Sequence, residues 1–196
     1  SPLRQALDRA GKTFACETGN YCPRAEPPAG FCQQNFALLY TDGYWNGGAG
    51  VSSNEDADSA ANRFDGGRYA DAIAQTLADT AMYHYKRDFH PTYTNLVPIS
   101  RLDQVGAAPG AFASGQSTMH QHMKTYTLAF GVRGTIDPAS VPADPVVPFA
   151  WTDPFNAPAH KIDDLLHAAL NGRGEYLNAS NPQELQVALE RAFLAF

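Results

Sequence analysis

The residue best suited to binding chemistry is a carboxylate that directly follows an apolar run. Residues 36–40 are all apolar, and Thr41, Asp42 and Gly43 come immediately after them. A short apolar run bounded by turn residues predicts a buried parallel strand. Ligands of open parallel sheets bind beyond the carboxyl ends of the strands, where a carboxylate suits a hard divalent cation. Asp-Gly is also a common turn pair, so a plain turn is the alternative interpretation.

Aromatic side chains surround the same turn. Tyr40, Tyr44 and Trp45 are close together in the sequence, and Asn46 follows them. Because Tyr and Trp dominate the hot spots of protein interfaces, we expect Tyr44, Trp45 and Asn46 to form a binding surface. The alternative is that these rings pack beneath a neighbouring loop.

A second acidic segment falls in a long polar stretch between residues 46 and 67. Its carboxylates Glu55, Asp56 and Asp58 are of the type that binds calcium through oxygen. Their spacing lacks the glycine and the final glutamate of an EF-hand loop. We therefore favour a solvated loop over a calcium site.

The histidines support a different hypothesis, a metal-dependent hydrolase. His120 and His122 would place both rings on one face of a strand, and Asp42, Asp163 and His167 would complete the site. This hypothesis requires the side chains to converge, because bonds to a metal ion are only about 2 Å long. Surface histidines are the simpler interpretation, and an aspartate at a helix start is explained by the helix dipole alone.

Motifs and composition argue against several classes of protein. The sequence has no Gly-x-Ser-x-Gly nucleophile turn and no phosphate-binding Gly-x-x-x-x-Gly-Lys-Ser/Thr loop. We therefore do not expect an enzyme. With 14 Lys and Arg against 20 Asp and Glu, binding to nucleic acid or to anionic membranes is also not expected. No apolar run approaches the ~20 residues that span a bilayer, and the polar start at Ser1 does not resemble a signal peptide.

Three cysteines lie in one segment rich in glycine and proline. Cys16 and Cys22 could close a short disulfide loop in an oxidising compartment. Cys32 would then be left to pair with sequence outside this chain. Three free thiols are an equally good interpretation.

Helical and strand-like patterns alternate along the chain. Apolar spacing predicts helices over 3–14, 69–87, about 162–171, and from Asn181 onward, and strands over 36–40, 125–132 and 175–177. This order predicts an α/β fold with a mostly parallel sheet and helices on both faces. Because only a few strands are visible, we expect the sheet to be incomplete in this chain. We expect a single domain over 1–196, with long loops at about 15–31, 46–67 and 92–118.

Several segments together resemble the von Willebrand A-like domain of the PilC/PilY type IV pilus proteins. One of them is residues 32–47, Cys-Gln-Gln-Asn-Phe-Ala-Leu-Leu-Tyr-Thr-Asp-Gly-Tyr-Trp-Asn-Gly. Other similar segments follow in the family's order at residues 1–9, 69–88, 121–132, 162–176 and 181–185. Together these segments extend over nearly the whole chain.

The resemblance implies a metal-dependent adhesion site. Such sites use an Asp-x-Ser-x-Ser turn, a threonine and an aspartate. Asp42 matches the aspartate, and Ser1 stands at the threonine position. The Asp-x-Ser-x-Ser turn is absent from this sequence, so magnesium, manganese or calcium would meet an incomplete set of ligands.

The resemblance also implies a role. It indicates a pilus-tip adhesin and pilus biogenesis module that attaches to a surface or to host cells. Its partners would be pilin subunits or other pilus-tip proteins, together with a host or abiotic surface ligand. The location would be extracytoplasmic, at the pilus tip or cell surface, reached through the periplasm. The alternatives are the hydrolase described above and a structural fragment without a ligand site of its own.

Overall fold

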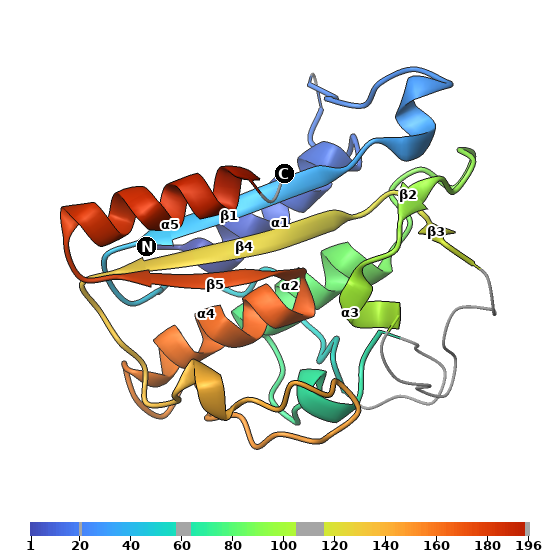
Figure 1. Cartoon of the computed structure of the whole chain (residues 1–196). Helices are drawn as coiled ribbons and strands as arrows, with labels where there is room; N and C mark the ends of the chain where they lie inside the picture. The colour runs from blue at the N-terminus through green and yellow to red at the C-terminus, as the bar shows by residue number, and fades with distance from the viewer. Residues whose placement is uncertain (20, 58–63, 105–115, 195–196) are drawn as a thin grey trace.

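The computed structural model describes residues 1–19, 21–57, 64–104 and 116–194. Its centre is a three-stranded parallel sheet with the strand order β1-β4-β5 (Figure 1). The strands are β1 (Asn35–Thr41), β4 (Met123–Phe130) and β5 (Arg173–Ala179). The predicted α/β class and the parallel pairing are confirmed, and each expected strand is present.

Helices cover both faces of this sheet, as predicted. One face carries α1 (Leu3–Phe14), α2 (Leu77–Lys86) and α4 (His160–Asn171), and the other carries α5 (Pro182–Leu194) (Figure 1). Alternate residues of β4 serve two cores. Met123 and Ala129 pack with the three-helix side, and Leu128 packs with α5. A central strand covered on both faces carries apolar residues on each face, which is the pattern that predicted it, although Thr125 and Thr127 of β4 are also buried.

The second helix is shorter than its apolar spacing predicted. The expected helix over 69–87 begins only at Leu77, and Gly67–Tyr69 forms a separate 3-10 turn. A capping box sets this start: Thr76 Oγ1 accepts a hydrogen bond from Asp79 N, and the Asp79 carboxylate accepts one from Thr76 N. This local cap overrides the apolar period that suggested an earlier start.

The ends of the last two helices agree with the sequence. Helix α4 ends at Asn171, with Gly172 as its C-cap. Helix α5 begins at Pro182, and Asn181 Oδ1 accepts a hydrogen bond from Glu184 N at 2.9 Å. No helix within the described ranges has both the length and the apolar character needed to cross a membrane.

The segment expected as a loop over 92–118 contains short elements that the sequence did not reveal. Strand β2 (Val97–Pro98) pairs antiparallel with β3 (Thr118–Met119), and α3 spans Arg101–Gln104. Two-residue strands carry too little periodic pattern to be recognised from sequence.

The amino-terminal loop is closed covalently. Cys16 and Cys22 form a disulfide whose Cα atoms are 4.7 Å apart, whereas Cys32 is free and exposed. The interpretation with three free thiols is therefore wrong for this structure.

The sheet is open at both sides. In the part of the chain that the structure describes, β4 has neighbours on either side, while β1 and β5 each pair along one edge only. A three-stranded parallel sheet between helical layers is compatible with an incomplete Rossmann-like von Willebrand A fold.

Candidate functional site

The turn after β1 lies next to the first residue of the chain. Ser1 O accepts a hydrogen bond from Asn46 N at 2.8 Å, and the Ser1 amino group donates to Tyr44 O at 3.5 Å. Figure 1 shows the amino terminus at the end of the sheet where β1 finishes. Ser1 and Asp42, the two expected metal ligands, therefore lie in neighbouring segments. We call Ser1, Asp42, Tyr44 and Asn46 the rim.

The rim by itself does not contain enough ligand atoms for a metal site. Asp42 and Ser1 are both exposed, and together they offer one carboxylate and one hydroxyl. Magnesium and calcium take six or more oxygen ligands, and side chains usually provide several of them. We therefore assign no cation to the rim on the residues present.

Trp45 does not belong to the exposed surface on which we expected it. Only 2% of the residue is accessible, and it packs in the main core. The Arg4 guanidinium lies over its ring at 4.1 Å, and the Phe155 ring is 5.7 Å away. Tyr44 is 45% exposed. The alternative interpretation, packing beneath neighbouring segments, thus holds for Trp45, and the polar side of the turn remains as surface.

A hollow lies at the same end of the sheet, beyond β4. Its volume is about 390 Å³, and residues 133–138 line it together with Tyr176 and Asn178 of β5. The carboxyl ends of the strands therefore border both the rim and a concave surface, the arrangement that parallel sheets use for ligands.

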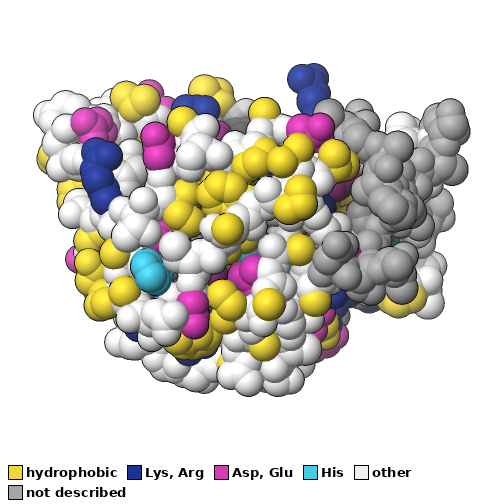
Figure 2. Space-filling model, turned by 90° about the horizontal axis from the view of Figure 1, so that it is seen from below, with side chains coloured by type: hydrophobic (Ala, Val, Ile, Leu, Met, Phe, Trp, Pro, Cys, Tyr) yellow, Lys and Arg dark blue, Asp and Glu magenta, His cyan; other side chains and the backbone are white. Residues whose placement is uncertain are grey.

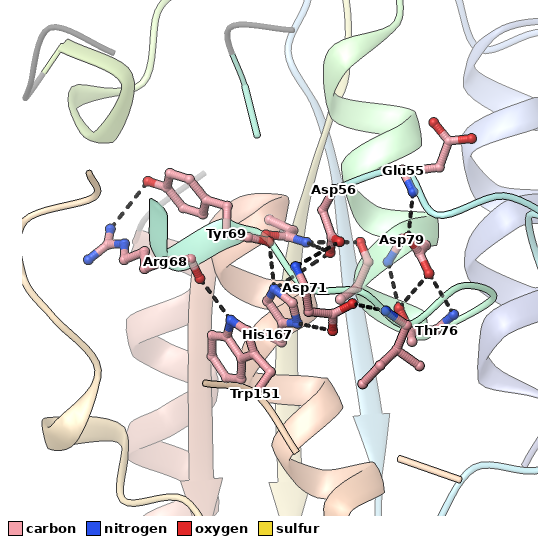
Figure 3. A network of polar contacts seen from close by, with 12 residues as sticks. Glu55, Asp56, Arg68, Tyr69, Asp71, Thr76, Asp79, Trp151 and His167 are labelled. Atoms are coloured by element: carbon pink, nitrogen blue, oxygen red, sulfur yellow. Dashed lines mark hydrogen bonds and ion pairs between the residues drawn. The ribbon is translucent and has the colours of Figure 1, made fainter. Parts of the chain in front are cut away.

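The second candidate is a buried group of metal-ligating side chains from the loop before α2 and from helix α4. Asp56, Asp71 and His167 each offer one ligand atom, and these atoms all lie within 4.8 Å of one another. Figure 3 shows the two carboxylates beside the His167 ring, with Asp56 near Nε2 and Asp71 near Nδ1. We call these three residues the acidic-histidine cluster.

Hydrogen bonds fix the backbone of both aspartates and the carboxylate of Asp56. Asn54 Oδ1 accepts from Asp56 N at 3.2 Å, and Asn54 Nδ2 donates to Asp71 O at 2.9 Å. Asp56 Oδ1 in turn accepts from Asp71 N at 3.3 Å. From α4, Asn171 Nδ2 donates to Asp56 Oδ2 at 2.6 Å. Two loop segments and a helix end are thereby joined around one point.

Two contacts fix the orientation of the His167 ring, one at its edge and one on its face. Its Nε2 lies 2.8 Å from Tyr69 O, and the Trp151 ring stacks on the imidazole at 3.9 Å with an interplanar angle of 8°. Trp151 Nε1 donates to Arg68 O at 2.8 Å (Figure 3). Because a carbonyl only accepts, the neutral ring must carry its proton on Nε2. Its Nδ1 then carries a lone pair and lies 3.6 Å from Asp71 Oδ2.

Burial shifts the protonation of all three groups. It raises the pKa of Asp56 to about 9, and the charges of Asp79 and Asp71 add to this effect. It also raises the pKa of Asp71 to about 6. Burial lowers the pKa of His167 to about 3. The imidazole is therefore neutral at pH 7, and its approaches of 3.6 Å to the two carboxylates are not ion pairs.

A further buried carboxylate borders the cluster. Asp164 of α4 accepts hydrogen bonds from Leu77 N and Ala78 N, each at 3.0 Å. These are free backbone donors at the start of α2, so a carboxylate there is favourable. Burial nevertheless raises the pKa of Asp164 to about 7.

The expectation of a solvated acidic loop is wrong for Asp56. This residue is 0% exposed, and its neighbour Glu55 contacts Lys86 at 2.7 Å. Asp58 lies outside the described residues. Asp71 was not singled out from the sequence, because no spacing links it to Asp56 or to a helix more than ninety residues further on.

The convergence required by the hydrolase hypothesis does not occur. The rings of His120 and His122 are 5.9 Å apart, and the first ring lies 3.3 Å from a backbone carbonyl, that of Tyr85. Within the described ranges, the group of three potential ligands contains His167 but neither Asp42 nor Asp163. No shared metal site therefore forms from the residues of that hypothesis.

Comparison with known proteins supports a relationship that the fold alone does not define. A parallel sheet between helical layers places the chain in the α/β class. Over 97% of its length it is 31% identical to the "Type IV pilus biogenesis factor PilY1" of Pseudomonas aeruginosa strain PAK, and equally to that of strain PAO1. The protein of that name from strain UCBPP-PA14 is 28% identical over the same share of the chain. These matches support the resemblance to the PilC/PilY proteins.

The similarity concerns one region of much larger relatives. This chain spans 18% of the length of each of the three PilY1 proteins. No family model matches the chain. No solved structure matches it either.

Proposed function

We propose that this chain is a non-enzymatic module of a type IV pilus biogenesis factor. The observation that carries the proposal is the identity of 31% over 97% of the chain with a PilY1 protein. Its partners are then pilin subunits or other proteins of the pilus tip. The sheet and its helices act as a rigid frame, and the segments beyond the strand ends act as the contact surface.

We further propose that the rim and the adjacent hollow form an attachment surface. Tyr44 is 45% exposed beside the exposed Asp42 and Asn46, and Tyr combines a large apolar area with a polar hydroxyl. The hollow of about 390 Å³ extends this surface across the ends of β4 and β5. The ligand class would be a surface or host-cell component that accepts aromatic and polar contacts.

An extracytoplasmic location fits two features. The Cys16–Cys22 disulfide belongs to an oxidising compartment, and the relatives are named as pilus biogenesis factors. Figure 2 looks onto the α4 side of the molecule. Hydrophobic and acidic side chains intermingle on this face, and basic ones are scattered over the part drawn in colour. That face is unlike the clustered basic surface that nucleic acids require.

The test is a chimera. The segment of P. aeruginosa PilY1 that aligns with this chain is replaced by residues 1–196, and surface pili and twitching motility are measured. We expect piliation to return to at least half of the parental level. A chimera that is folded and secreted normally but yields no pili contradicts the proposal.

The attachment surface is tested in the same chimera. Tyr44→Ala combined with Asp42→Ala is expected to reduce attachment to surfaces several-fold while the number of pili is unchanged. The matched control is Tyr21→Ala, which removes a 68% exposed tyrosine elsewhere. Equal attachment by both variants would exclude the rim as the contact surface.

A further inference from the structure

We propose that the acidic-histidine cluster is a buried divalent-metal site that fastens the loop around Asp56 and Asp71 to helix α4. This inference is independent of the rim and of pilus function. The ligands would be one carboxylate oxygen each from Asp56 and Asp71, and Nδ1 of His167.

The distances fit a common ion. His167 Nδ1 lies 3.6 Å from Asp71 Oδ2, and Nε2 of the same ring lies 3.6 Å from Asp56 Oδ2. One ligand atom from each of the three residues lies within 4.8 Å of the other two. Two ligands of a tetrahedral ion with bonds of about 2.1 Å are roughly 3.4 Å apart. Only small side-chain adjustments would therefore bring the three atoms into one coordination sphere.

The hydrogen bonds around the cluster are those that orient metal ligands. Ligating histidines usually donate their second ring N–H to a carbonyl or carboxylate, and His167 Nε2 is 2.8 Å from Tyr69 O. Asp71 Oδ1 accepts from Ile73 N at 2.6 Å, which leaves its Oδ2 facing the imidazole. The loop backbone thus holds one oxygen of this carboxylate and turns the other inward.

The facing atoms lack a positive charge between them. Nδ1 of the neutral His167 and Oδ2 of Asp71 both only accept hydrogen bonds when Asp71 is ionised. Two basic side chains in this part of the molecule pair with carboxylates outside the cluster: Lys86 contacts Glu55 at 2.7 Å, and Arg173 contacts Asp103 at 2.7 Å. A divalent cation at the centre would supply the positive charge that these facing acceptor atoms lack.

An independent observation points to a missing ligand or ion. Asn171 is 0% exposed, and its Oδ1 has no hydrogen-bond partner, although its Nδ2 contacts Asp56. Buried amide oxygens without partners are rare in native proteins. An ion beside Asp56 would place a charge, or an ion-bound water, within reach of this amide.

The donor set selects the class of metal. One imidazole nitrogen with two carboxylates suits zinc, manganese or ferrous iron, whereas calcium and magnesium prefer oxygen alone. His167 is 2% exposed and covered by the Trp151 ring. Because the site is closed, its role is structural: it ties the loops before α2 to α4.

The experiment uses the full chain, purified without a metal-chelate column. After treatment with EDTA, the protein is incubated with zinc, manganese or calcium chloride and dialysed, and bound metal is measured by mass spectrometry. We expect about one zinc or manganese ion per chain, no retained calcium, and a melting temperature raised by about 5–10 °C at saturating zinc.

Variants separate a designed site from incidental binding. Asp71→Asn and His167→Gln should each abolish stoichiometric zinc and the rise in melting temperature. His122→Gln is the matched control, because His122 is equally buried but not in the cluster; it should bind zinc as the parent does. Retention of zinc by Asp71→Asn, or absence of bound zinc and manganese from the parent chain, overturns the proposal.

Folding failure of one variant does not leave the question open. Asp71→Asn preserves the size of the side chain and an oxygen that can accept from Ile73 N, so this variant is expected to fold even if His167→Gln does not. Cobalt binding gives a second readout, since a visible absorption band of the parent that is lost in Asp71→Asn reports ligands directly. A band that persists in this variant contradicts the site.

Discussion

The rim and the acidic-histidine cluster hold similar carboxylates in opposite surroundings. Asp42 projects from an exposed turn, whereas Asp56 is 0% exposed and hydrogen-bonded to a loop and a helix. An exposed carboxylate is free to meet a partner but contributes little to stability. A buried one is costly unless it is paired, so it marks a place where structure depends on charge. We therefore expect recognition at the rim and stability at the cluster.

The largest difference in stability between the two regions should come from replacing Asp164, which borders the cluster. Asp164→Ala leaves Leu77 N and Ala78 N without their acceptor. We expect a loss of about 3 kcal/mol in the free energy of unfolding, measured with urea. Asp42→Ala at the rim serves as control and should change it by less than about 0.5 kcal/mol. Similar losses from the two would remove the distinction between the regions.

The pH dependence of stability tests a buried histidine, His122, that lies outside the rim. Burial lowers the pKa of His122 to about 3, from a usual value of 6.5. The folded state therefore favours the neutral ring, and the stability is complete above pH 6.5. As the pH falls below this value, only the unfolded chain takes up the proton, and stability drops by about 1.4 kcal/mol per pH unit.

We expect His122 to account for about 2 kcal/mol of the loss between pH 7 and pH 5. In His122→Gln this share of the slope should disappear from urea unfolding curves measured at both pH values. An unchanged slope would show that the ring is not held neutral in the folded state.

The smallest expected difference in stability is between substitutions at two glycines, one beneath α2 and one at the rim. A methyl group at Gly11 of α1 would collide with the His84 ring of α2, whereas at Gly43 of the rim it would meet nothing within 4 Å. Although alanine favours helices, Gly11→Ala should cost about 1–2 kcal/mol because of overpacking. Gly43→Ala should be neutral within about 0.5 kcal/mol. Thermal unfolding of both variants is sufficient, and a stable Gly11→Ala would show that the interface between α1 and α2 can yield.

Features encoded within a few residues were predictable from the sequence. The apolar run at 36–40 indicated β1, and Asn181 with Glu184 indicated the start of α5, because strand periodicity and capping are local properties. The start of α2 was misplaced because Thr76 and Asp79 form a cap within a segment that keeps a helical apolar period.

The cluster was not predictable, because its parts come from distant segments. Asn171 reaches Asp56 over a separation of 115 positions, and no short motif records such a contact. The rim is closer to the opposite case: Asp42, Tyr44 and Asn46 lie in one turn directly after β1, and that turn was predicted from the sequence. Burial of Trp45 was not, since an aromatic residue after a strand suits both a core and a surface.

The one-sided pairing of β1 has a consequence for handling the protein. Its seven residues match β4 along a continuous register, and in the described chain no strand lies along the opposite border. Backbone groups on such a border accept an additional strand readily. Produced in isolation, the polypeptide should self-associate through this border as its concentration rises, and a peptide able to dock there in extended form should keep it monomeric.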